Sequence, residues 1–451
     1  MTELIRGEEW RHVTPIDQAD LAGVPTDAEV LAEARRRIPE IRMSDLAIRL
    51  VDRAGQPVRG LRVRIRQQRH HTVFGCCSGS TLAGSAANPA EAARAKHFLE
   101  LFNGTHAKCY WDERWHQPIE KEQGRRETAL FLAETDWAVA NRIEVRGHPL
   151  VWTVDKAIPA WMRKYSYDQQ FRFLEHHVRS MVALAKGRIR TWDLCNEMLW
   201  EPSLRNLPAR DWPHLESMDA IVDYIAPAMR WAREEDPTAA YCINEYGLET
   251  TFSWIKERHH KDVTAAGQRR RMVELTQRLR DAGAEPDAVG TQAHGSKWFP
   301  MGVVWRTFQD LALAGTDIHV SEFWAHQSDH PAPEGRSEQQ KADDQAAYIC
   351  DYYTVAFGTP RVTQICYWGG SEAFFSHEGW RTTPAYAALK RLIREQWWTD
   401  TEVVSDADGV LRARVFHGDH ALTWTTEQGA TRAREVRVTP ATRNDPTWSI
   451  A

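Results

Sequence analysis

The stretch that decides the fold is IRTWDLCNEMLW, residues 189–200. Its first half is rich in apolar and β-branched residues, as in a buried strand, but it runs directly into the polar pair Asn196-Glu197. A buried strand avoids such a pair, because an unpaired buried charge is costly. The pattern therefore predicts a strand that ends at an accessible face, where the carboxylate of Glu197 need not enter the core.

Seven other runs resemble this strand, and segments with helical spacing separate them. The predicted strands are residues 72–77, 104–110, 143–152, 189–197, 239–246, 287–294, 316–323 and 361–368. Apolar residues recur every three or four positions in the segments between them, for example in residues 90–102, 127–142, 167–187 and 219–236. Eight strand-then-helix units predict an α/β fold, a (β/α)8 TIM barrel, with a doubly wound open sheet as the alternative.

The two flanks of this region have a different pattern. Residues 45–70 read as two alternating strands joined by a turn, and residues 400–451 contain more strands of the same kind. We expect the flanks to pair into one small β-rich accessory domain beside a barrel spanning residues 71–399. Residues 1–44 read as a helical or irregular extension, and two unrelated β appendages are the alternative.

Composition excludes several classes of partner. The chain has 451 residues with 57 basic and 62 acidic side chains, and no block of like charge suggests nucleic acid or a membrane surface as a partner.

The N-terminus lacks the apolar core of a signal peptide, so we expect a cytoplasmic chain, or a secreted one if a leader has been removed. Seven scattered Cys indicate reduced thiols. Adjacent histidines at 70–71 and 259–260 rarely face one ion, so neither a metal nor a cofactor is expected. The oligomeric state stays open.

A second carboxylate ends the seventh predicted strand, where Glu322 follows an apolar run. In a barrel, Glu197 and Glu322 would face each other across the carboxyl ends of the strands. Glycoside hydrolysis needs such a pair, one acid to protonate the leaving oxygen and one carboxylate to attack or to position water. A separation of roughly 5 Å between them would mean retention of configuration.

Six motifs occur in the order seen in glycoside hydrolase family 10, the retaining β-xylanase family, which residues 72–396 therefore resemble. They are RGHPLVW (146–152), WDLCNE (192–197), GTQAH (290–294), HVSEF (319–323), CYWGGSE (366–372) and TTPAYAALKRL (382–392). The resemblance implies that Glu197 is the acid/base, that Glu322 is the nucleophile, and that the substrate is a carbohydrate. It further implies sugar contacts from Asn196, His148, Trp152, Gln292, His294, Trp368, Trp111 and Tyr246. For Tyr246 and the neighbouring Glu245, capping of the loop is an equally open role.

The chain also departs from the family pattern. The family shows Glu-Asn-x-Met-Lys-Trp after its second strand, whereas this chain has HAKCYW at 106–111, with Ala107 for Asn and Tyr110 for Lys. Phe323 and Trp324 replace the usual Leu-Asp after the nucleophile. The expected substrate is xylan or a xylo-oligosaccharide, and the alternatives are another β-glycan, a glycosylated small molecule, or carbohydrate binding without turnover.

Overall fold

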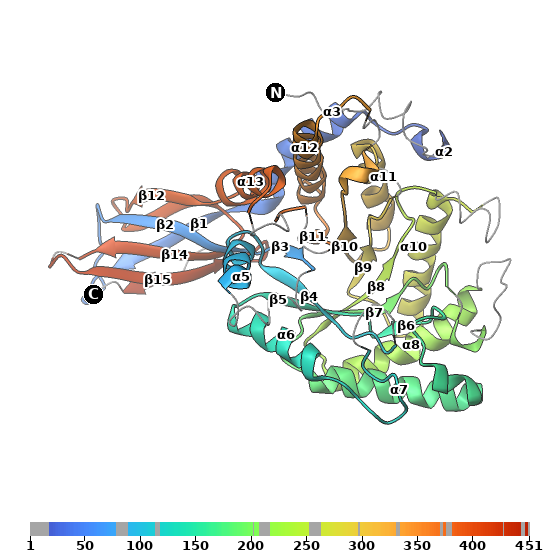
Figure 1. The fold of residues 1–451 in the computed structure, drawn as a ribbon. Coiled ribbons are helices and arrows are strands. Elements are labelled where there is room, and N and C mark those ends of the chain that lie inside the picture. The colour runs from blue at the N-terminus through green and yellow to red at the C-terminus, as the bar shows by residue number, and fades with distance from the viewer. Residues whose placement is uncertain are drawn as a thin grey trace.

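The computed structural model shows a closed barrel of parallel strands beside a β-sandwich (Figure 1). It describes residues 18–77, 89–112, 118–201, 203–206, 217–251, 263–295, 298–330, 334–369, 373–375, 381–426, 428–442 and 447–449. Among the described helices, none is both long enough and apolar enough to cross a membrane.

The barrel sheet forms from parallel neighbours in the order β5-β4-β3-β11-β10-β9-β8-β7-β6, and an added pairing of β5 with β7 closes it. Its strands are β3 (Val73–Cys76), β4 (Gly104–Lys108), β5 (Glu144–His148), β6 (Val151–Trp152), β7 (Thr191–Asn196), β8 (Ala240–Glu245), β9 (Ala288–Thr291), β10 (Asp317–Phe323) and β11 (Val362–Tyr367). The predicted barrel is confirmed. The third predicted strand is divided into β5 and β6, and Pro149 lies between them, where its missing N–H cannot join the ladder.

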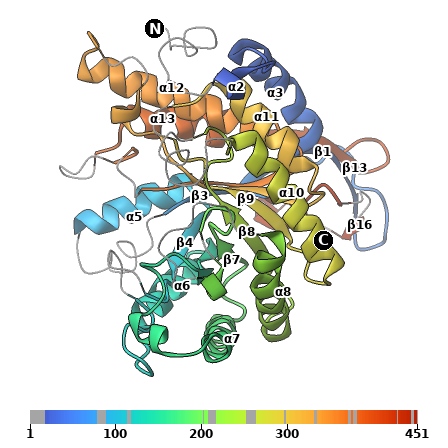
Figure 2. The same ribbon diagram turned by 90° about the vertical axis from the view of Figure 1, so that its right-hand side faces the viewer.

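Helices surround the strands, as Figure 2 shows. They are α5 (Pro89–Leu101), α6 (Ala129–Ala140), α7 (Tyr167–Leu184), α8 (Met218–Glu235), α10 (Ala265–Asp281), α11 (Met301–Ala312), α12 (Glu338–Phe357) and α13 (Pro384–Arg391). Shorter turns are η2 (Ala160–Lys164), η3 (Leu204–Asn206), η4 (Gln327–Asp329) and the π-helical η5 (Leu392–Gln396). α7 and α8, for example, bury apolar residues that recur every three or four positions, the pattern that predicts an amphipathic helix.

A glycine on β5 makes room for a large ring on the outer face of the barrel strands, beside α6. Trp192 on β7 is 1% exposed, and its ring lies over Gly147 on β5. A Cβ atom added to Gly147 would lie 2.3 Å from Trp192 Cε3, well inside van der Waals contact. The glycine in the RGHPLVW motif therefore makes room for the tryptophan in the WDLCNE motif.

Both flanks of the chain build the sandwich. In one sheet, β1 (Met43–Val51) pairs with β13 (Val410–Phe416) and β16 (Thr447–Ser449). In the other, β2 (Arg62–His70) lies between β12 (Asp400–Val404) and β14 (Gly418–Thr425), and β14 pairs with β15 (Thr431–Val438). The sheets enclose a separate apolar core that includes Ile48, Ile65 and Leu422. The expected pairing of the flanks is confirmed, and the exact domain boundaries stay a prediction.

A helix before the sandwich joins it to the barrel. After the short α2 (Gln18–Leu21), α3 (Asp27–Arg42) runs along the barrel and ends in Arg42, which is 6% exposed. The Arg42 guanidinium donates to the carbonyl oxygens of Phe357, Thr359 and Val362 at 2.7–2.8 Å. These bonds tie the start of β1 to the end of α12 and the start of β11.

We expect Gly147→Ala to lower the free energy of unfolding by about 1–3 kcal/mol, because overpacking forces buried side chains out of their preferred rotamers. Urea unfolding followed by tryptophan fluorescence measures this change. The double variant Gly147→Ala/Trp192→Phe is the control, since a smaller ring leaves room for the methyl group. Its loss should be smaller than the sum of the two single losses, and strict additivity would contradict the contact.

Candidate active site

Two carboxyl groups lie at the carboxyl ends of β7 and β10. Glu197 directly follows β7, with φ at +62°, and its N–H donates to Asn244 O at 2.8 Å. A positive φ is uncommon for a non-glycine residue and marks a local conformation that the surrounding structure must hold in place. Glu322 lies within β10 and is 3% exposed. The predicted positions of both carboxylates at strand ends therefore agree with the structure.

The Glu197 carboxyl accepts two side-chain hydrogen bonds. Trp152 Nε1 donates to Oε2 at 2.7 Å, and Gln292 Nε2 donates to Oε1 at 3.0 Å. Burial raises the pKa of Glu197, while these two bonds and the Lys156 charge act in the opposite direction. A raised pKa keeps a proton available for general acid catalysis.

The Glu322 carboxyl has an amide donor and two imidazole neighbours. Asn244 Nδ2 donates to Oε1 at 2.7 Å, while His148 Nε2 lies 3.9 Å from Oε1 and His294 Nε2 lies 3.6 Å from Oε2. Burial, followed by the negative charges of Asp193 and Glu197, raises the pKa of Glu322 well above its usual range. The two carboxyls thus influence each other and resist simultaneous ionisation.

Amide side chains connect the two carboxyls. Gln292 Nε2 reaches Asn196 Oδ1 at 3.3 Å as well as Glu197, and Asn244 Nδ2 donates to the same Asn196 oxygen at 2.8 Å. Because Asn244 also bonds Glu322, a continuous chain of amides runs from one carboxyl to the other. Asn244 was not among the predicted site residues. Its position at the end of a predicted strand, in register with Asn196, was the signal that could have identified it.

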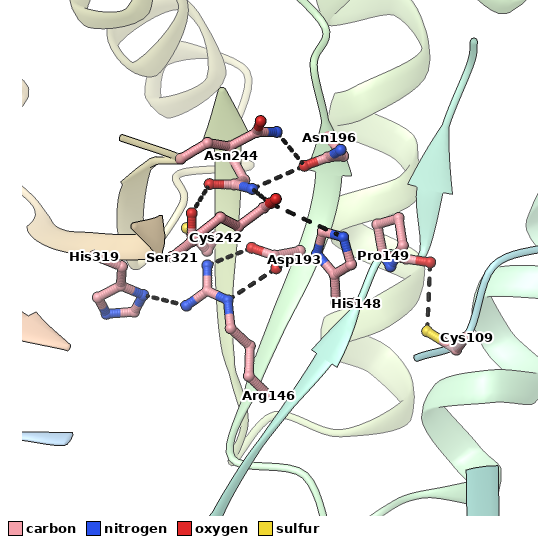
Figure 3. Close-up of polar contacts among 12 residues, drawn as sticks. Cys109, Arg146, His148, Pro149, Asp193, Asn196, Cys242, Asn244, His319 and Ser321 are labelled. Carbon is pink, nitrogen blue, oxygen red and sulfur yellow. Dashed lines mark hydrogen bonds and ion pairs between the residues drawn. The ribbon is translucent and has the colours of Figure 1, made fainter. Parts of the chain in front are cut away.

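A buried ion pair supports the site from within the barrel. Figure 3 shows Arg146 facing Asp193, with His148 on the other side of the carboxylate. Arg146 Nε donates to Asp193 Oδ2 at 2.8 Å, and His148 Nδ1 lies 2.8 Å from the same oxygen. Burial alone would raise the pKa of Asp193, but Arg146 and His148 hold it below its usual range. The ionised Asp193 orients His148 so that Nε2 points towards Glu322.

Half-buried tryptophans flank the carboxyls. The Trp368 ring contacts that of His148, with centroids 5.0 Å apart, and Trp152 lies 5.6 Å from the Tyr110 ring. On the other side of Glu322, His294 stacks flat on Trp324 at 3.9 Å. Burial lowers the pKa of His294 to about 3, so this ring is neutral at pH 7 and acts on Glu322 as a dipole.

Two of the predicted sugar contacts lie apart from this cluster. Trp111 is 5% exposed and stacks on His177 of α7, with ring centroids 4.4 Å apart. Tyr246 packs on Trp200, while the Glu245 carboxyl accepts from the N–H groups of Leu199 and Tyr246. The carboxyl of Glu245 thus caps the loop that follows Glu197, the role that the sequence left open. Of the paired histidines, His70 faces Ile393 O, and residues 259–260 lie outside the described part of the chain.

Comparison with known proteins places this site in a family. The profile of glycosyl hydrolase family 10 matches residues 74–389. Endo-1,4-beta-xylanase C of Paenibacillus barcinonensis is 30% identical over 46% of this chain and 18% of its own length. Anti-sigma-I factor RsgI6 of Acetivibrio thermocellus is 24% identical over 89% of this chain and 47% of its own length. The chain therefore spans less than half of each of these relatives.

The fold has counterparts among solved structures. Xylanase 10B of Thermotoga petrophila in complex with xylobiose aligns with a TM-score of 0.55 at 20% identity, over 72% of this chain and 95% of that one. At this identity the likeness establishes the barrel fold alone.

We expect Glu322→Gln to stabilise the protein at alkaline pH. Because the folded-state pKa of Glu322 is raised, folding favours its protonated form, and stability is lost as pH rises from the ordinary carboxyl pKa through the raised one. Gln cannot ionise and still accepts from Asn244, so the melting temperature at pH 8 should increase by roughly 3–6 °C. The gain in melting temperature should vanish near pH 4, where Glu322 is protonated in the folded protein. The exposed Glu435→Gln is the control, and an equal gain there would contradict the burial argument.

Proposed function

Because the chain belongs to glycosyl hydrolase family 10, we propose that it is a retaining β-glycoside hydrolase that cleaves β-1,4-xylosidic bonds in xylan or xylo-oligosaccharides. The observation that carries the proposal is the pair of carboxyls, Glu322 buried and Glu197 half-buried, joined by Gln292, Asn196 and Asn244. This arrangement provides two acidic groups of raised pKa and amide donors between them for sugar hydroxyls.

The chemistry follows a double displacement. The Glu322 carboxylate attacks the anomeric carbon, while Glu197 gives its proton to the departing glycosidic oxygen. Glu197 then takes a proton from water, and that water releases the sugar from Glu322. Since the two carboxyls repel each other's charge, one proton serves the pair, and the productive form holds it on Glu197.

Neighbouring side chains position the sugar. Trp368 and Trp152 offer flat apolar faces, against which the C–H side of a pyranose can pack. His148, held by Asp193, and Asn196, held by Asn244, can hydrogen-bond to hydroxyls of the reacting sugar. These contacts strengthen as the ring distorts towards the oxocarbenium-like transition state.

A related hydrolase acting on another β-glycan or on a glycosylated small molecule is the second candidate. Tyr110, which replaces a family lysine, is 4% exposed and packs against His148 and Trp152. A buried phenol at this position changes the polar groups available to the neighbouring sugar, while the carboxyl pair is unaffected.

The first experiment is covalent trapping. Intact-mass spectrometry after incubation with 2-fluoro β-xylobioside, xyloside, cellobioside and glucoside, each with a good leaving group, should reveal one adduct that peptide mapping assigns to Glu322. The adduct should be absent from Glu322→Ala. Xylobioside labelling supports the xylanase, while labelling by cellobioside alone supports the second candidate. Failure of all four compounds to label the protein would contradict both and favour binding without turnover.

We expect the loss of activity in Glu197→Ala to depend on the leaving group of the substrate. Without the acid, kcat/KM should fall by about 10²–10⁴-fold on aryl xylobiosides with poor leaving groups, and far less on those that depart unprotonated. Steady-state rates on a series of substituted phenols measure this contrast. Glu201→Ala, four residues along the chain, should show no such dependence on the leaving group. A uniform loss across the series in Glu197→Ala would show that this residue is not the acid.

A further inference from the structure

The turn after β7 holds Glu197 in an uncommon backbone conformation. Glu197 is one of three non-glycine residues with a positive φ in the described part of the chain. Such a conformation persists only where neighbouring contacts fix it. The Glu197 N–H donates to Asn244 O, and its carbonyl oxygen accepts from the Trp200 and Glu201 N–H groups at 3.2 and 2.9 Å. The direction of the Glu197 side chain therefore depends on how this turn is held.

A buried carboxyl on the neighbouring strand bonds to this turn. Glu245 is the last residue of β8, and its side chain is fully buried. Its Oε2 accepts from the Leu199 N–H at 2.7 Å, and its Oε1 accepts from the Tyr246 N–H at 2.9 Å. One side chain thus connects the turn after Glu197 to the end of β8. Because Leu199 is two residues beyond Glu197, loss of this connection would let the turn and the acid move together.

The main chain of Glu245 fixes a second neighbour of the acid. The Gln292 N–H donates to Glu245 O at 2.8 Å, and the Gln292 side chain donates to the Glu197 carboxyl. Burial raises the pKa of Glu245 well above its usual range, the Leu199 N–H lowers it, and the negative charge of Glu197 raises it further. Glu245 therefore lies within electrostatic reach of Glu197 and bonds to two segments that place it.

Resting on the proposed glycosidase function, we propose that Glu245 is a positioning residue for the acid/base, and that its two backbone hydrogen bonds keep the Glu197 carboxyl directed at the glycosidic oxygen. A general acid must lie within hydrogen-bond reach of the atom that it protonates. A displacement of about 1 Å can lower the rate by roughly 100-fold. A carboxyl suits this role because it presents two acceptor oxygens in one rigid plane, whereas a side-chain amide presents one.

The test asks whether a Glu245 variant shows the loss expected of a displaced acid. Glu245→Gln keeps the size of the side chain but has one acceptor oxygen, so one N–H group loses its partner. On aryl xylobiosides with poor leaving groups, kcat/KM should fall by about ten- to hundredfold. On those whose leaving groups depart unprotonated, it should fall by less than about threefold. The dissociation constant of xylobiose should stay within about twofold, because the groups that bind the sugar are unchanged.

Asp236→Asn is the matched control. The buried Asp236 carboxyl also accepts from two backbone N–H groups, those of Thr238 at 2.9 Å and Gly187 at 3.4 Å, beside the opposite ends of β7 and β8. Any loss in this variant should be the same for every leaving group. Glu245→Asp, which keeps two acceptors on a shorter side chain, should show the leaving-group dependence with a smaller loss, and it replaces Glu245→Gln if that variant does not fold. A uniform loss in the Glu245 variants, or an equal dependence in Asp236→Asn, overturns the inference.

A spectroscopic measurement separates this inference from the proposed function. The Trp152 indole N–H donates to Glu197 Oε2, so its proton–nitrogen NMR signal reports where that carboxyl lies. The signal is assigned by its loss in Trp152→Phe. In Glu245→Gln it should move towards its position in Glu197→Ala, and in Asp236→Asn it should stay in place. If no substrate is cleaved but the signal moves in this way, the hydrolase proposal fails while Glu245 still places Glu197. A signal that Glu245→Gln leaves unchanged overturns the inference, even where activity falls.

Discussion

The ion pair between Arg146 and Asp193 is the constraint on which the site depends. Both side chains are buried in the barrel interior. An unpaired charge there would lower the stability of the fold by roughly several kcal/mol, the desolvation penalty of one buried ion. Arg146 also reaches His319 and Gln364, so its donors bond to three strands around the barrel. Asp193 in turn orients His148 and adds negative charge near Glu322. The interior ion pair thus orients His148 and adds to the effect of burial in raising the pKa of Glu322.

The parallel strands of a closed barrel all end on the same face, which explains how residues far apart in sequence form one cluster. Asn196 and Asn244 are register partners on adjacent strands, and Glu322 lies across the barrel mouth from Glu197. The side-chain amides hydrogen-bond to the polar atoms at these strand ends. Buried polar groups that would be costly if unpaired therefore form one hydrogen-bonded network. The same geometry leaves Trp152 and Trp368 half-buried beside this network.

Local patterns were sufficient to predict the eight strand positions and the barrel, because short apolar, β-rich runs and helical spacing report burial directly. They also placed Glu197 and Glu322 at the ends of strands. They were insufficient for Trp111, whose ring turns towards α7 and stacks on His177, since a tryptophan near a strand end can face either side. Asn244 was missed because its importance arises from register with Asn196, a long-range property. Pro149 is a local signal for the break between β5 and β6, whereas the short β16 depends on pairing with β1, a partner that no local window contains.

The sandwich has a consequence for how the chain folds during synthesis. β1 and β2 are translated before the barrel, but their partners β12, β13 and β14 are translated after it. The apolar faces of the first two strands therefore emerge from the ribosome some three hundred and thirty residues before they can be covered, roughly twenty to sixty seconds at ordinary elongation rates. Arginines alternate along β2, and they keep this waiting segment charged and soluble. Closure of the sandwich therefore cannot precede synthesis of the whole barrel.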